Sequence, residues 1–104
     1  MSLREKQSDF VMMVADLIHF VYDKGWELTF GDAYRDSRVT YGHAKSLHRS
    51  RLAIDMNLFV DGKYIRGASP EYTEIGEYWE SLGGSWGGRF DDHNHFSLAH
   101  GGMK

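Results

Sequence analysis

Cysteine is absent from this sequence, which excludes disulfide bonds and thiolate chemistry. A metal ion would therefore be held by histidine and carboxylate ligands. Long apolar runs are absent too, since the longest, FVMMVA, is far too short to cross a bilayer. The N-terminus, MSLREKQSDF, lacks the apolar core of a secretory signal peptide. We therefore expect a protein that is made in the cytoplasm and inserts into no membrane.

An excess of positive charge is also missing. Twelve lysines and arginines stand against 15 aspartates and glutamates, which gives a formal net charge of −3. Nucleic-acid-binding domains usually carry a basic excess, so nucleic acid is excluded as a partner. A chain of 104 residues with 41% hydrophobic residues supplies one modest core. We expect one domain over residues 1–104, acting as a monomer.

Apolar periodicity and turn signals divide the chain into helices and strands. A 3.6-residue apolar period behind a Ser2–Glu5 capping box predicts a helix over residues 2–24. Asp61-Gly62 is typical of a hairpin turn. The other expected elements are strands at 26–34, 51–60 and 93–98, a long loop at 35–50 and a helix at 70–82. These elements predict a small α+β domain with a mainly antiparallel sheet and flanking helices.

The segment SLHRSRLAID, residues 46–55, carries the first candidate site residues. His48 lies just before the predicted strand, and Asp55 lies within it. A carboxylate among apolar strand residues needs a partner, which is an arginine, a hydrogen-bond network or a metal. The structural alternative is a salt bridge to Arg35, Arg49 or Arg51.

The segment WGGRFDDHNHFSL, residues 86–98, carries the second group. On the predicted strand His93 and His95 share one face, and Asp92 lies three residues before His95. The glycines Gly87 and Gly88 are expected to leave room for a peptide substrate. A polar turn with solvated histidines is the alternative for this segment taken alone.

Together the two segments supply the parts of a catalytic zinc site. Neutral imidazoles and one carboxylate form a suitable ligand set, and three protein ligands leave a fourth position open for water. A further carboxylate outside the ligand set is suited to accept a proton from that water.

Both segments resemble motifs of the zinc peptidases that cut bacterial peptidoglycan. SLHRSRLAID resembles the motif Ser-x-His-x-x-Gly-x-Ala-x-Asp, and DDHNHF resembles a second motif with an acidic residue three before a histidine. These enzymes are D-alanyl-D-alanine carboxypeptidases and dipeptidases, and L-alanyl-D-glutamate endopeptidases of phage endolysins. The WGG stretch resembles the endolysin version, and the resemblance covers about residues 26–98. One position departs, because Arg51 replaces the motif glycine.

The resemblance implies a role for each candidate residue. His48, Asp55 and His95 would bind zinc, and Asp92 would be the general base. Arg35 would bind the substrate carbonyl or the developing oxyanion. The implied substrate is the peptidoglycan stem peptide, reached after release from the cytoplasm, as for a phage- or prophage-encoded endolysin.

Two alternatives to an endolysin-like L-alanyl-D-glutamate endopeptidase stay open. One is a carboxypeptidase or dipeptidase acting on terminal D-Ala-D-Ala. The other is a non-catalytic zinc- or wall-binding module on the same fold. Such a module has no chemical need for Asp92 and Arg35, so their presence favours an enzyme.

Overall fold

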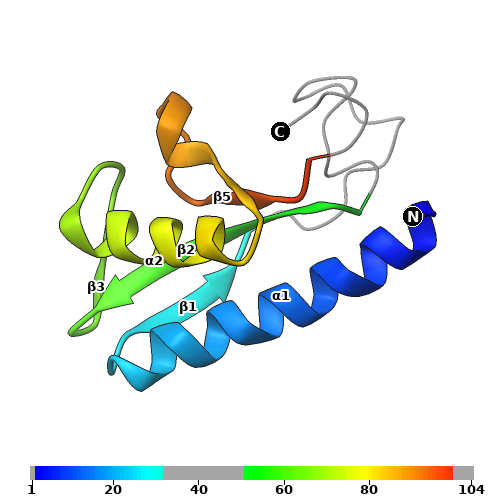
Figure 1. Cartoon of the computed structure of the whole chain (residues 1–104). Coiled ribbons are helices and arrows are strands. Elements are labelled where there is room, and N and C mark those ends of the chain that lie inside the picture. Colours follow the sequence, from blue (N-terminus) through cyan, green and yellow to red (C-terminus); the bar gives the residue numbers. More distant parts are fainter. Residues whose placement is uncertain (1, 32–50, 100–104) are drawn as a thin grey trace.

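The structure, a computed structural model, describes residues 2–31 and 51–99 (Figure 1). The elements in these ranges are α1 (Leu3–Asp23), β1 (Glu27–Phe30), β2 (Ala53–Val60), β3 (Lys63–Tyr64), α2 (Pro70–Ser81), β4 (Ser85–Trp86), the 3₁₀ helix η1 (Gly87–Phe90) and β5 (His95–Ser97). Each strand pairing between them is antiparallel. The predicted α+β class is therefore confirmed. The loop predicted at 35–50 lies outside the described residues.

Strand β2 is the centre of a sheet with the order β1-β2-β5-β4. Strand β1 pairs along one edge of β2, with Leu28 opposite Leu58. The other edge is shared, since β5 pairs with the start of β2 and β3 pairs with its end. The hairpin turn between β2 and β3 is confirmed, because Asp61 and Gly62 both have positive φ, 53° and 76°.

Local sequence signals define the ends of the helices. The Ser2 Oγ accepts a hydrogen bond from the Glu5 N–H at 3.1 Å, and the Glu5 carboxylate accepts one from the Ser2 N–H at 3.0 Å, which confirms the capping box. Ser69 caps α2, and Pro70 opens its first turn. Neither helix in the described ranges has the length and hydropathy needed to cross a membrane.

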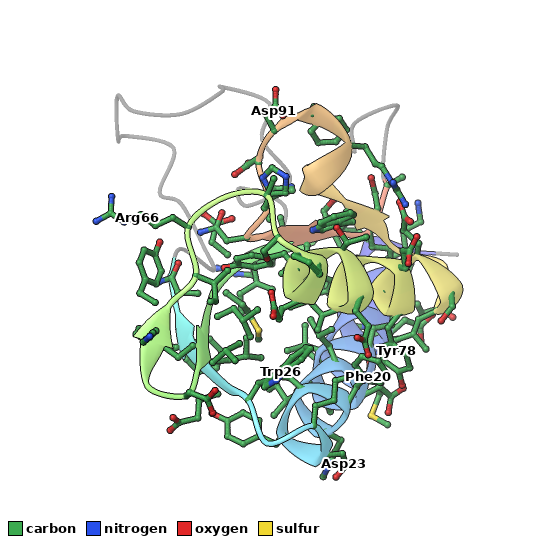
Figure 2. All side chains as sticks on the ribbon, turned by 90° about the vertical axis from the view of Figure 1, so that its left-hand side faces the viewer. Phe20, Asp23, Trp26, Arg66, Tyr78 and Asp91 are labelled. Atoms are coloured by element: carbon green, nitrogen blue, oxygen red, sulfur yellow. The ribbon has the colours of Figure 1, made fainter. Side chains whose placement is uncertain are left out.

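The apolar core lies between the two helices and one face of the sheet. Its buried residues are Phe10, Leu17, Val21, Leu52, Ala53, Ile54, Met56, Leu58, Tyr72, Ile75, Trp79, Trp86 and Phe96. The helices also contact each other through a ring stack of Phe20 on Tyr78, with centroids 4.0 Å apart (Figure 2). Because side chains alternate along a strand, Asp55 and Asn57 lie on the face of β2 opposite to Ile54 and Met56. The sheet therefore presents polar groups on the face that the core does not use.

The segment after α2 differs from the prediction. The strand expected at 93–98 is shorter, His95–Ser97, and it is preceded by β4 and η1, which were not predicted. A two-residue strand is too short to show alternation, and glycine-rich sequence favours a loop. Only pairing with β5 makes β4 a strand.

Tyr72 completes the hydrogen bonding of β2 between β5 and β3. Its hydroxyl donates to the Met56 carbonyl at 3.1 Å and accepts from the Leu58 N–H at 3.0 Å. Burial raises the pKa of this hydroxyl from 10.0 to about 12. The folded protein therefore keeps the proton at pH values where the unfolded chain releases it.

This raised pKa predicts a loss of stability at alkaline pH. The contribution of Tyr72 is present below pH 10 and is lost as the pH rises from about 10 to about 12, by about 3 kcal/mol. Urea unfolding of the wild type and Tyr72→Phe across this range measures it. The difference between their free energies of unfolding should shrink as the pH rises, and parallel pH profiles would contradict the prediction.

Candidate functional site

The pairing of β2 with β5 brings two of the predicted zinc ligands together. Asp55 and His95, forty residues apart in the chain, are direct cross-strand partners. The His95 Nδ1 lies 3.3 Å from the Asp55 Oδ1, and the two side chains are 11% and 20% exposed. The backbone at Gly31 lies close to Asp55, and the Gly31 N–H donates a hydrogen bond to the Asp55 carbonyl at 2.7 Å. A Cβ at Gly31 would lie only 3.0 Å from the Asp55 Cβ.

The spacing of the two donor atoms fits a shared zinc ion. Ligand atoms about 2.0–2.2 Å from one tetrahedral zinc lie about 3.4 Å from each other. The same 3.3 Å separation is also that of a hydrogen bond between the imidazole and the carboxylate. In residues 2–31 and 51–99, however, no three His, Asp or Glu side chains form a group able to hold a metal. A three-ligand site that includes this pair would need its third donor from outside these residues.

Asp92 lies beside this pair, in the turn that leads into β5. Its Oδ2 is 3.9 Å from the His95 Nδ1, and its side chain is 57% exposed. Two backbone hydrogen bonds shape the turn, from the Asp92 N–H to the Gly87 carbonyl at 2.9 Å and from the His95 N–H to the Asp92 carbonyl at 3.1 Å. A cleft of about 190 Å³, lined partly by Tyr64 and Ile65, leaves Asp92 reachable from solvent. Asp92 is thus close to the Asp55–His95 pair and accessible from solvent.

His93 does not share a strand face with His95, so that prediction is wrong. His93 lies in the turn before β5, where its ring packs edge-on to Trp86 and near Tyr72. Its carbonyl accepts a hydrogen bond from the Trp86 indole N–H at 2.8 Å. The turn forms because the chain reverses between the antiparallel strands β4 and β5, which alternation alone cannot show. Trp86 is the contact that sequence reasoning missed.

The glycines of the WGG stretch serve the protein's own packing. A Cβ at Gly87 would lie 2.3 Å from the Asp92 carbonyl oxygen and 2.7 Å from the His95 Cβ. A Cβ at Gly88 would lie 2.2 Å from the Trp86 ring. Because the chain itself fills this space, the expectation that the glycines leave room for a substrate is wrong. Asp91, the other carboxylate of the cluster, is exposed at the tip of the turn (Figure 2).

Arg51 adopts the backbone conformation that the motif glycine would favour. Its φ is 58°, in the left-handed region, two residues before the start of β2. A side chain there costs about 1–2 kcal/mol relative to a residue in the right-handed region. The arginine at the motif glycine position therefore has a glycine-like backbone conformation at a cost in stability.

A side-chain hydrogen bond joins the turn before β5 to β2. The Asn94 amide donates to the Asn57 Oδ1 at 3.1 Å.

The remaining predicted site residues, Arg35 and His48, lie outside the described residues. The structure thus brings together Asp55, Asp92 and His95, three of the five predicted site residues.

A family model described as D-alanyl-D-alanine carboxypeptidase matches residues 40–98. The matched segment contains His48, Asp55, Asp92 and His95, and it begins after Arg35. No curated protein matches the chain significantly.

Proposed function

The chain belongs to the D-alanyl-D-alanine carboxypeptidase family, and on this premise we propose that it is a zinc metallopeptidase that hydrolyses the peptidoglycan stem peptide. The observation that carries the proposal is the Asp55–His95 pair at ligand spacing, with Asp92 beside it. The exposed carboxylate of Asp92, 3.9 Å from the imidazole and outside the pair, supports the proposal because a base beside the metal is what the reaction needs.

His48 is proposed as the third zinc ligand and Arg35 as the residue that binds the substrate carbonyl. His48 precedes Leu52 by four residues, and Arg35 follows Gly31 by four. Four residues of chain span at most about 14 Å. Gly31 lies against Asp55, and the Leu52 carbonyl accepts from the Leu98 N–H at 2.9 Å, just past β5. Because only four residues separate His48 and Arg35 from these positions near the Asp55–His95 pair, the short segments support both assignments.

Each of these side chains has a separate role in the proposed reaction. Zinc, when bound, supplies Lewis acidity and lowers the pKa of water towards about 7. Asp55, His95 and His48 would hold the ion. Asp92 accepts the proton of the attacking water and passes it to the leaving amine. Arg35 binds the carbonyl oxygen as negative charge develops on it.

For the scissile bond we propose the L-alanyl-D-glutamate linkage, as in phage endolysins, acting on the wall after release from the cytoplasm. The resemblance of the WGG stretch supports this choice. The description of the matching family favours the second candidate, removal of the terminal D-alanine.

Mass spectrometry of digested peptidoglycan distinguishes the candidates. New L-alanine carboxyl ends and D-glutamate amino ends are expected from the endopeptidase. Loss of terminal D-alanine would identify a carboxypeptidase. A dipeptidase would leave peptidoglycan unchanged and split free D-Ala-D-Ala into two D-alanine molecules, which is measured on the dipeptide alone. A protein that binds zinc and hydrolyses neither substrate would be a non-catalytic module.

A further inference from the structure

Two buried tryptophans donate their indole N–H groups to carbonyls on either side of His95. Trp86 donates to the His93 carbonyl at 2.8 Å, and Trp79 donates to the Ser97 carbonyl at 2.9 Å. Their side chains are equally inaccessible, at 3% and 0% exposure. The two bonds differ in position, because the first falls between Asp92 and His95 and the second falls at the end of β5.

The ring of Trp86 is clamped between α2 and η1. A Cβ at Gly76 of α2 would lie 2.1 Å from the ring, and one at Gly88 of η1 would lie 2.2 Å from it. The Arg89 guanidinium lies 5.2 Å from the ring centroid and is itself held by two hydrogen bonds to Glu80, at 3.1 and 2.7 Å. Contacts on several sides of the ring therefore fix the position of the indole N–H.

The turn that receives this hydrogen bond contains the proposed base and leads directly to a proposed ligand. Its other backbone bonds anchor Asp92 to η1 and Asn94 to β2, since the Met56 N–H donates to the Asn94 carbonyl at 2.8 Å. The His93 carbonyl lies between these anchors. Without its donor, a half-buried carbonyl would be left unsatisfied, at a cost that favours rearrangement of the turn.

We infer that Trp86 is a positioning residue, which sets the placement of Asp92 relative to His95 through the His93 carbonyl. This inference rests on the proposed function. Trp86 acts through the backbone of the turn. A displacement of about 1 Å in a catalytic group can cost about a hundredfold in rate, and loss of groups that orient metal ligands costs about ten- to a hundredfold in affinity or activity.

The test compares Trp86→Phe with Trp79→Phe, which removes the same kind of hydrogen bond from the same strand region. Steady-state kinetics on a stem peptide, zinc affinity by chelator competition and the visible spectrum of the cobalt(II) form are measured for both. Trp86→Phe should lower kcat about ten- to a hundredfold with little change in KM, weaken zinc binding and change the cobalt spectrum. Trp79→Phe should lower the melting temperature with less than about a twofold effect on kcat and zinc affinity.

Equal effects of the two variants on kcat, zinc affinity and the cobalt spectrum would overturn the inference and leave Trp86 with a packing role. If Trp86→Phe fails to fold, Arg89→Ala loosens the same ring from an exposed position, and an unchanged kcat and zinc affinity there would overturn it equally. A wild type that binds zinc without turnover contradicts the proposed reaction, while the affinity comparison still tests the inference. A wild type that binds no zinc overturns both.

Discussion

Asp92→Asn is expected to lower kcat by about a hundred- to ten-thousandfold while the protein keeps its zinc. Asparagine has nearly the same shape as aspartate but cannot accept the proton of the attacking water at neutral pH. Zinc should be retained because Asp92 is 57% exposed and lies outside the Asp55–His95 pair. Metal analysis of the purified variant and its turnover of a stem peptide, measured side by side, check both halves of this expectation.

Asp91→Asn is the matched control for this experiment. It removes the same charge one residue earlier, from an exposed side chain in the left-handed conformation, φ 61°, which asparagine also accepts. This control should stay within about twofold of the wild-type rate, like most surface substitutions. Full activity in Asp92→Asn would show that another group is the base, and loss of zinc in it would make Asp92 a ligand.

His95→Ala is expected to abolish stoichiometric zinc binding and, with it, turnover. A three-ligand site that loses one of its two imidazoles keeps too few donors to hold the ion. Zinc at a hundred times its dissociation constant would stabilise the folded wild type by about 2.7 kcal/mol. For a domain of this size that corresponds to a change of roughly 10–20 °C in melting temperature. A chelator should therefore lower the melting temperature of the wild type and leave that of His95→Ala unchanged.

His93→Ala tests whether the metal ligand is His95 or the nearby His93. The His93 ring packs near Trp86 and Tyr72 in the turn, so its removal should leave a zinc ion bound. If His93→Ala loses the metal and His95→Ala keeps it, the two histidines have been assigned the wrong way round. If both keep it, the zinc site lies elsewhere.

Features that depend on neighbouring residues could be predicted from the sequence. The capping box at Ser2 and the Ser69-Pro70 start of α2 were predictable because a helix end is satisfied by side chains within three or four residues. The Asp61-Gly62 turn was predictable for a similar reason, since a two-residue hairpin requires positive φ. Alternation along β2 also put Asp55 on the face away from the core.

The way in which the two segments of the candidate site meet depends on the pairing of strands and could not be predicted from the sequence. The register of β5 on β2 makes Asp55 and His95 partners, and a shift of one residue would turn His95 to the other face. That register lies in the pairing of β5 with β2, which are about forty residues apart, and the turn before β5 also contacts Trp86 and Gly87. Such contacts leave no periodic signal in the chain, which is why the sequence identified His95 and Asp92 as partners of Asp55 by motif and misplaced His93 and the glycines beside them.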